Sequence, residues 1–244
     1  MVYELAGVLP IVKKNLRIYY MKGPVIIFGI LLPIFFFLAF WMGRDMPELM
    51  LGTGLVAMAL WFTSTSISPV IASWETRTKT LERLISSPVS VPVIVLGDIL
   101  SSVIMGVILT AVPVTIAAVA LSLPLAHLFA LAVGILFGAV CFSAIGVIMG
   151  AYPSKATSDV MMLATLVKFP IVFISGIFIP VDELPAWGQT VAYLSPLTYL
   201  TDLINYGFGG PGDPLLDLGA LAVFILLFTG LAVIMHKRTL PRRI

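Results

Sequence analysis

Two ionisable side chains, Lys168 and Asp98, stand inside long apolar segments of this chain. A charge within the hydrocarbon of a membrane is costly, so such residues face a partner, a cavity or water and are candidates for function. Lys168 lies nine residues beyond Asp159, which places it about 14 Å along a helix and near the middle of a membrane. Asp98 lies six residues after Pro92 and is shallower. The two charges either pair with each other or line the path of a substrate.

Other residue patterns that carry chemistry are missing from the sequence. It contains no G-x-x-x-x-G-K-[ST] phosphate-binding loop, no G-x-S-x-G motif and no H-E-x-x-H motif, so we expect neither ATP hydrolysis nor peptide hydrolysis by those routes. His127 and His236 have no metal ligand at useful spacing, and Cys141 is the single cysteine. We therefore expect no catalytic residue, no metal site and no cofactor in the chain itself.

The composition is that of an integral membrane protein. Hydrophobic residues make up 60% of the 244 residues and charged residues 11%, whereas soluble domains are about 45–50% apolar. The net charge of +2 is spread over short segments, and a nucleic-acid-binding protein needs a concentrated basic face. We therefore expect membrane lipids, and no nucleic acid, among the partners of the chain.

Six apolar segments are long enough to cross a membrane, which takes about 20 residues. The first lacks the small-residue cleavage pattern of a signal peptide, so we expect it to be retained. The sequence predicts an all-α protein with one transmembrane domain over residues 1–244. Its predicted spans are approximately 24–42, 52–74, 92–121, 128–152, 160–179 and 215–235.

Basic residues gather between alternate spans and so indicate the orientation. They precede the first span and follow the second, fourth and sixth, at Lys13, Lys14, Arg17, Lys22, Arg77, Lys79, Arg83, Lys155, Lys237, Arg238, Arg242 and Arg243. The opposite side carries only Arg44, and residues 180–219 contain five acids and no base. Because cytoplasmic segments are enriched in Lys and Arg, we expect both termini in the cytoplasm.

Two segments next to the predicted spans have helical patterns. After the second span, Trp74, Thr78, Leu81 and Ile85 recur at helical spacing and predict a short helix over about 75–86 that ends before Pro88. This segment is either a solvated loop or an element that docks a partner. Residues 9–24 mix bases with apolar side chains, which is typical of an interfacial helix or of a topogenic anchor.

The stretch from 173 to 204 breaks from an apolar run into prolines, acids and aromatics. Its apolar positions keep a helical period at Leu184, Trp187, Val191 and Leu194, and again at Leu197, Leu200 and Ile204. These two short helices cannot span a membrane, and backbone that enters one without spanning must be buried in protein or line a cavity. We expect an outward re-entrant or interfacial hairpin over about 180–206, or else a surface lid without a role in transport.

Two small-xxx-small pairs, Gly134 with Gly138 and Gly146 with Gly150, lie along the fourth predicted span. Small residues at this spacing allow helices to approach closely. The pairs therefore indicate either packing within the bundle or a dimer face.

The motifs together resemble those of ABC transporter type-2 permeases. The stretch "SGIFIPVDELPAWGQTVAYLSPLTYLTDLI" is similar to the hallmark of that family at Ser175, Gly176, Pro180, Leu184, Pro185, Trp187, Gln189, Pro196, Leu197, Thr198, Tyr199 and Asp202. The segment "ETRTKTLERLISSPVS" resembles its cytoplasmic segment at Glu75, Thr80, Leu81, Glu82, Leu84, Pro88 and Val89. The order of elements agrees along essentially the whole chain. Three departures are Lys79 in place of a common Gly, Asp98 where Lys often follows Gly97, and Asn205 where Arg often follows Pro-Leu-Thr-Tyr.

This resemblance implies a six-span subunit of an ATP-driven exporter in the cell membrane. Two such subunits, identical or related, would each dock on a separate cytoplasmic ATPase, which dimerises with ATP and Mg. The helix over 75–86 would couple to that ATPase, with Glu75, Thr80, Leu81, Glu82 and Leu84 as its site residues. The outer hairpin would help close the extracellular side through Gly176, Pro180, Leu184, Pro185, Trp187, Pro196, Tyr199 and Asp202.

The implied substrate is hydrophobic, amphipathic or lipid-linked, as in drug, lipid or polysaccharide efflux. A second hypothesis is a small ion-coupled secondary carrier that uses Lys168 and Asp98 as charge sites and shows gradient-driven flux. A third is an intramembrane enzyme, for which the sequence offers no set of acid, base and nucleophile.

Overall fold

The computed structural model describes residues 7–21, 23, 27–43, 46–86, 89–154 and 156–240. All secondary structure in these ranges is helical, which confirms the predicted all-α class. Several residues used in the sequence predictions lie outside the described ranges, namely Lys22, Pro24, Arg44, Pro88, Lys155, Arg242 and Arg243.

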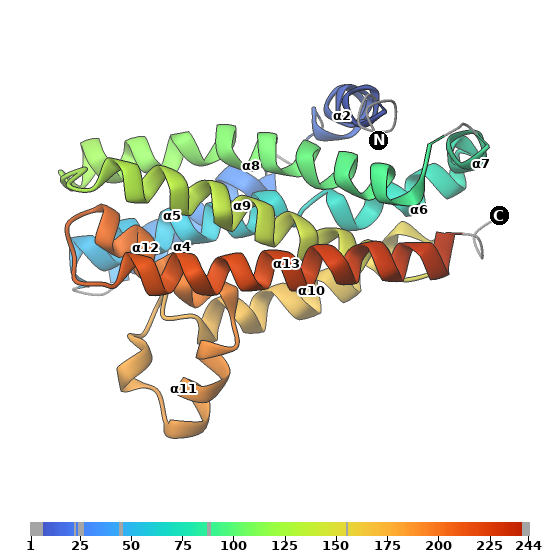
Figure 1. The fold of residues 1–244 in the computed structure, drawn as a ribbon. Coiled ribbons are helices and arrows are strands. Elements are labelled where there is room, and N and C mark those ends of the chain that lie inside the picture. The colour runs from blue at the N-terminus through green and yellow to red at the C-terminus, as the bar shows by residue number, and fades with distance from the viewer. Residues whose placement is uncertain are drawn as a thin grey trace.

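The helices form a bundle of long, nearly parallel elements with short helices at its edges (Figure 1). The elements before the second predicted span are α2 (Val8–Asn15), the π-helical turn η1 (Leu16–Tyr20), the π-helical turn η2 (Ile27–Leu31) and α4 (Leu32–Gly43). The middle of the chain forms α5 (Glu48–Ser64), α6 (Ser68–Arg77), α7 (Thr80–Ile85), α8 (Val91–Ala120) and α9 (Leu128–Gly150). The remainder forms α10 (Thr157–Ile174), η3 (Val181–Glu183), α11 (Ala186–Tyr193), α12 (Pro196–Gly207) and α13 (Pro214–Thr239).

Five helical segments of the described chain are long and apolar enough to cross a membrane. They are Glu48–Arg77, Val91–Ala120, Leu128–Gly150, Thr157–Ile174 and Pro214–Thr239. In the region of the predicted first span, the described apolar helix Gly29–Ala39 is shorter than these five. The first predicted span, over about 24–42, therefore stays a prediction.

The helix that follows α4 is interrupted where the sequence predicted one uninterrupted span. α5 ends at Ser64 and α6 begins at Ser68. At the break the Thr65 hydroxyl donates to the Trp61 carbonyl at 2.6 Å and the Ser66 hydroxyl donates to the Thr63 carbonyl at 2.9 Å. Pro69 in the first turn of α6 has no N–H to continue the helical ladder. The backbone N–H groups of Thr65 and Ser66 donate to the same two carbonyls at 3.1 and 3.3 Å, so the hydroxyls add a second hydrogen bond to each carbonyl at the break.

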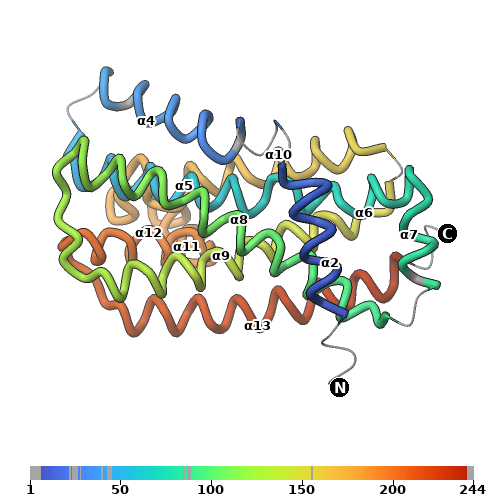
Figure 2. The backbone as a smooth tube through the Cα atoms, turned by 90° about the horizontal axis from the view of Figure 1, so that it is seen from above, coloured from blue at the N-terminus to red at the C-terminus, as the bar shows by residue number. Residues whose placement is uncertain are grey.

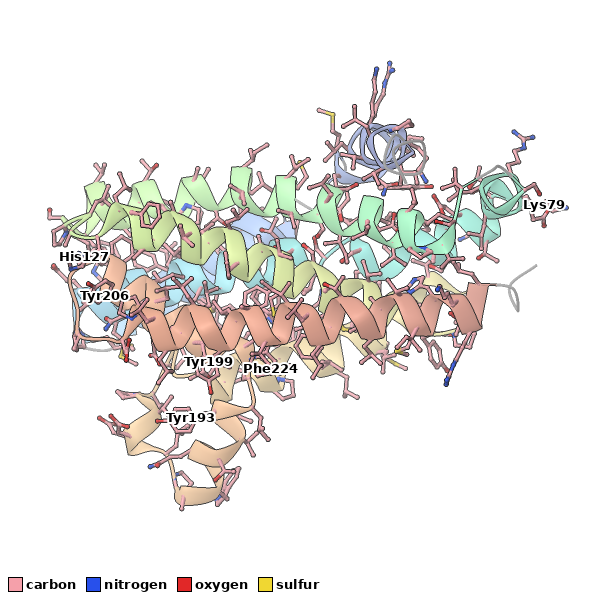
Figure 3. All side chains as sticks on the ribbon, viewed as in Figure 1. Lys79, His127, Tyr193, Tyr199, Tyr206 and Phe224 are labelled. Carbon is pink, nitrogen blue, oxygen red and sulfur yellow. The ribbon has the colours of Figure 1, made fainter. Side chains whose placement is uncertain are left out.

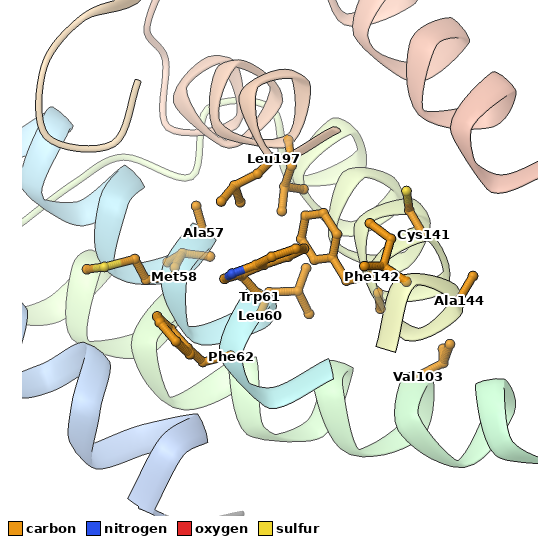
Figure 4. Close-up of a cluster of buried hydrophobic side chains, with 14 of the residues drawn as sticks. Ala57, Met58, Leu60, Trp61, Phe62, Val103, Cys141, Phe142, Ala144 and Leu197 are labelled. Carbon is orange, nitrogen blue, oxygen red and sulfur yellow. The ribbon is translucent and has the colours of Figure 1, made fainter. Parts of the chain in front are cut away.

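The core of the bundle is built around α5, which neighbouring helices enclose. Trp61 lies at its centre, where its ring meets Phe142 of α9 edge-on with centroids 4.8 Å apart, as Figure 4 shows. Gly138 of α9 faces Leu200 of α12, and Gly150 faces the Pro69 carbonyl. The α9 glycines therefore pack against helices of the same chain, which favours bundle packing over a dimer face.

The first described helix lies across the bundle rather than along it (Figure 2). α2 packs on α8, and a Cβ atom at Gly97 of α8 would lie 2.6 Å from Cγ2 of Ile11. Glycine at position 97 therefore allows α2 to approach this closely.

The stretch predicted as one outer hairpin divides into two parts with different surroundings. η3 and α11 project sideways from the bundle (Figure 1), whereas α12 packs among α5, α9 and α13. Leu197, Leu200 and Ile204 of α12 are fully buried. The apolar positions of α12 thus complete the bundle core, and the outward re-entrant or interfacial hairpin over about 180–206 stays a prediction.

Candidate functional site

Polar side chains of α2, α6 and α8 meet where α2 crosses the bundle. We call this group the α2 junction. Its members are Lys14 and Asn15 of α2, Glu75 of α6 and Asp98 of α8. The Lys14 ammonium forms an ion pair with the Glu75 carboxylate. The Asn15 amide donates a hydrogen bond of 2.6 Å to Oδ1 of Asp98. Asn15, Glu75 and Asp98 are all buried, so these contacts join α2 firmly to α6 and α8.

Aromatic and apolar contacts extend the α2 junction on both sides. Tyr19 of η1 stacks on Trp74 of α6, with ring centroids 5.5 Å apart and planes at 26°. Burial and the neighbouring Glu75 carboxylate raise the pKa of Tyr19 to about 12. Leu84 of α7 packs on a cluster that includes Ile11 of α2 and residues at the start of α8. α7 is therefore in contact with the same helices that the polar pairs join.

The segment predicted as one coupling helix over 75–86 is interrupted. Glu75 belongs to α6, and a new helix, α7, begins at Thr80. Between them Lys79 has φ 56° and ψ 20°, in the left-handed region that L-residues with a side chain seldom adopt. The common Gly at this position of the resembling family has a physical reason here, because glycine enters that region without strain.

The predicted coupling residues also differ in exposure. Glu75 is buried and ion-paired, and Leu81 is 1% exposed. Leu84 is half-buried, whereas Thr80, Glu82 and Arg83 are exposed. Figure 3 places Lys79 at the end of the bundle away from His127. The exposed charges of α7 are therefore Glu82 and Arg83, and the buried Leu81 packs the helix against the protein.

Hydrogen bonds also hold the projecting η3 and α11, which lie far from α7 (Figure 1). The hydroxyls of Ser175 and Ser195 lie 2.8 Å apart and join the two backbone segments that lead to and from it. The Gln189 amide donates to the carbonyls of Leu184 and Asp182 at 2.9 and 3.2 Å. These contacts hold η3 and α11 as one unit.

Tyrosines connect that unit and α12 to the bundle. The Tyr199 hydroxyl donates to the Tyr193 carbonyl at 3.0 Å, and the Tyr199 ring packs on Phe224 of α13, as Figure 3 shows. His127 and Tyr206 stack with ring centroids 4.2 Å apart.

A hollow of about 530 Å³ lies beside this unit and is lined by Asp182, Tyr193 and Asp202, among others. Burial and the nearby Asp182 raise the pKa of Asp202 to about 6. Of the predicted gate residues, Gly176 and Pro180 also line the hollow. Leu184 and Tyr199 are half-buried, Pro185 is exposed, Trp187 is 70% exposed, and Pro196 is buried at the start of α12.

Lys168 and Asp98, the two intramembrane charges, do not pair. Asp98 is bonded to Asn15 in the α2 junction, while Lys168 lines a small cavity between α10 and the break between α5 and α6. In the described part of the chain, Lys168 has no ion pair. The secondary-carrier hypothesis thus finds no shared charge site among the described residues.

Sequence reasoning missed Lys14, Asn15 and Tyr19 as members of a site. A signal was available, because Ile11, Asn15 and Tyr19 follow one another at four-residue spacing and share one face of a helix. An amide on an otherwise apolar face indicates a buried hydrogen-bond partner. The identity of that partner could not be read from the same pattern.

Residues 12–208 match the family model described as ABC-2 type transporter. The chain belongs to the ABC-2 type transporter family. The match begins within α2 and ends just after α12, so it includes the α2 junction, α7 and the hollow beside α11. This ABC-2 chain is also a multi-pass membrane protein by its long apolar helices.

Two relatives give this ABC-2 chain a more specific context. The inner membrane transport permease YadH of Escherichia coli (strain K12) is 28% identical over 152 residues, which are 62% of this chain and 59% of that protein. Nodulation protein J of Rhizobium leguminosarum bv. trifolii is 34% identical over 125 residues, 48% of this chain and 45% of that protein. The chain therefore matches less than two thirds of the length of either relative.

Proposed function

We propose that the chain is the transmembrane permease subunit of an ATP-driven exporter. It moves a hydrophobic, amphipathic or lipid-linked substrate outward across the cell membrane and acts as a pair of identical chains. A dimer of separate cytoplasmic ATPase subunits binds ATP and Mg and supplies the energy. Family membership and the permease name of the YadH relative support this proposal. The observation that carries it is the α2 junction, which joins α2 to α6 and α8 and lies next to the cluster on which α7 packs.

The contacts suggest how movement of a partner reaches the bundle. A partner that binds Glu82 and Arg83 pulls or pushes α7, which Leu84 connects to α2 and α8. The Thr80 hydroxyl donates to the Glu75 carbonyl at 3.3 Å, so α7 is also tied to α6. Glu75 in turn holds Lys14. Coupling then requires that ATP-bound and ATP-free partners differ in affinity for two conformations of the permease.

The proposed orientation puts α7 and both termini in the cytoplasm and the hollow beside α11 outside. The positive charges support it, since Arg77, Lys79 and Arg83 lie near α7 and the hollow is lined by Asp182 and Asp202. The exposed apolar side chains of Trp187 in α11 and of Leu194, which follows α11, support a second permease chain or lipid beside this unit.

A pull-down from native membranes tests the proposal. The tagged chain, extracted in mild detergent, is expected to retain an ATPase with a phosphate-binding loop and to show ATP hydrolysis. Reversal of both exposed charges of α7, by Glu82→Lys with Arg83→Glu, is expected to lower ATPase recovery at least about tenfold, because close charge pairs across an interface are worth several kcal/mol.

The matched control is Glu183→Lys, which changes an exposed carboxylate next to α11. It is expected to leave ATPase recovery unchanged. Equal recovery of the ATPase with all three proteins would remove α7 from the interface. Absence of any ATPase together with gradient-driven flux in vesicles would overturn the exporter proposal.

A further inference from the structure

The side chain of Lys168 is buried, and its amino group lines a cavity without a partner in the described chain. The side chain is 8% exposed, and within the described ranges neither a hydrogen bond nor an ion pair is formed by its ammonium. A charge taken out of water is costly unless it is paired or hydrogen-bonded. Lys168 is therefore poised to receive an anion.

The cavity at Lys168 is small and built from three elements. Phe62 of α5, Ser66 of the break and Val70 of α6 form one wall, and Met161 and Thr165 of α10 form the other. None of the described lining residues is a carboxylate. The cavity measures about 50 Å³, and a single water needs about 10–15 Å³ by the same kind of measure. The space fits a few atoms of an anionic group and excludes a bulky molecule.

The backbone at Lys168 is held in place by the bundle core. The Trp61 indole N–H donates to the Lys168 carbonyl at 3.4 Å, and Trp61 is itself packed on Phe142. The lysine therefore projects from a fixed point of α10, next to the break between α5 and α6. A lysine that extends from this position into a cavity shared with the Thr165 side chain can donate hydrogen bonds to an oxyanion.

The cavity at Lys168 has an apolar rim. Met161 and Phe169 of α10 line it together with Phe62 of α5. Lys168 shares the buried face of α10 with Val160, Ala164 and Val172, so the exposed Met162 and Leu166 lie on the opposite face of the helix. The hydrocarbon part of an amphiphile whose head enters the cavity therefore meets the apolar rim.

We propose that Lys168 binds the carboxylate or phosphate head of an anionic amphiphile whose hydrocarbon part leaves the cavity over the apolar side chains of Met161 and Phe169. The Lys168 ammonium donates to the oxygens of the head, and Ser66 and Thr165 line its surroundings. The proposal names the substrate class of the exporter and depends on the proposed function only for the direction of movement.

The depth of Lys168 favours an amphiphile in transit over a lipid at rest. Lys168 lies eleven residues after the first residue of α10, about 16 Å along the helix axis. The hydrocarbon core is about 30 Å thick, so the heads of resting lipids lie about 15 Å from its middle. A head at Lys168 has therefore left the membrane interface.

Tryptophan quenching measures this binding without any ATPase. Trp41→Phe, Trp74→Phe and Trp187→Phe together leave Trp61 as the single reporter, since the chain has four tryptophans. In nanodiscs of phosphatidylcholine, stearic acid with a nitroxide on carbon 5 is expected to quench Trp61 saturably. Its methyl ester is expected to bind at least about tenfold more weakly, because it lacks the charge.

Variants of Lys168 decide whether the lysine causes this preference. Lys168→Met is expected to abolish the preference for the acid over the ester, and Lys168→Arg to retain it. Lys237→Met, which removes an exposed charge of α13, is the control and is expected to behave as the parent. An unchanged preference in Lys168→Met, or equal quenching by acid and ester in the parent, would overturn the proposal.

The wild-type chain provides a second readout that needs no tryptophan replacement. Oleate is expected to raise its Tm more than methyl oleate does, and a lack of difference counts against the site. Nanodiscs with added phosphatidylglycerol distinguish two sources of the anion. If phosphatidylglycerol competes with the fatty acid, the ligand is a bilayer phospholipid. If it does not compete, the ligand is a single-chain amphiphile. Loss of ATPase association with intact binding would reject the export function and leave the anion site standing.

Discussion

Asn15 and Asp98, which are 83 residues apart in the chain, are joined by a buried hydrogen bond of 2.6 Å. The bond connects a helix that lies across the bundle to one of its long members. Position 98 often carries Lys in the resembling permeases, and here a carboxyl group at that position meets an amide rather than a base. The departure from the family pattern is therefore matched by a local partner.

Loss of the Asn15 amide is expected to destabilise the permease by about 1–3 kcal/mol, because a buried polar group left without its partner bears the full cost of burial. Asn15→Ala should lower the Tm of the detergent-solubilised chain. The double variant Asn15→Leu with Asp98→Leu should recover part of the loss, since it removes both polar partners.

Asn205→Ala is the control for the Asn15 variants. It removes an exposed amide that donates to the Pro211 carbonyl at 3.0 Å, and the expected change in Tm is small. A double variant no more stable than Asn15→Ala would show that the contact between Asn15 and Asp98 is not what stabilises this junction.

The left-handed conformation of Lys79 predicts a stabilising substitution. L-residues in this region of φ and ψ are strained by about 1–2 kcal/mol, and glycine is not. Lys79→Gly is expected to raise Tm relative to Lys79→Ala, which removes the charge and keeps the Cβ atom. If both variants have the same Tm, the turn between α6 and α7 does not hold position 79 in the left-handed conformation.

The close approach of α9 to α6 predicts a destabilising substitution at Gly150. A Cβ atom at Gly150 would lie 2.9 Å from the Pro69 carbonyl oxygen, and backbone atoms cannot give way easily. Gly150→Ala is therefore expected to lower Tm by overpacking, at a cost of about 1–3 kcal/mol.

Gly230 of α13 offers open space instead, because a Cβ atom at this position would meet nothing within 4 Å. Gly230→Ala therefore serves as the matched control. It is expected to leave Tm unchanged or to raise it, because alanine is the better helix former. Equal losses from Gly150→Ala and Gly230→Ala would contradict the packing of α9 described above.

The pKa of Asp202 predicts a pH dependence of stability. Burial, with a contribution from Asp182, raises this pKa from its ordinary value of 3.8 to about 6. The folded state then binds the proton more tightly than the unfolded state, so the contribution to stability is complete below about pH 3.8 and is lost as pH rises through 6.

Melting curves of the wild type and Asp202→Asn between pH 4 and 7 check this expectation. The wild type should lose stability relative to the variant as pH rises through about 6. Asp182→Asn should shift the transition to lower pH, because it removes one negative neighbour. Parallel curves for the wild type and Asp202→Asn would exclude Asp202 as the titrating group.

Much of the architecture could be predicted from local properties of the sequence. Runs of apolar residues indicated five of the long helices within a few residues, and Pro196 correctly separated α11 from α12. Proline and hydropathy act over a few neighbouring residues, so a short window contains all the information they need.

The sequence by itself determined that this is a helical membrane protein and that Lys168 stands within an apolar segment long enough to cross a membrane. Only the tertiary structure decided that Asp98 accepts a hydrogen bond from Asn15 and does not pair with Lys168. It also decided that α12 is buried and that α7 is separated from α6 at Lys79. The physical reason is distance along the chain. Hydropathy and periodicity report one helix at a time, whereas a partner for a buried charge is selected by how separate helices pack against one another.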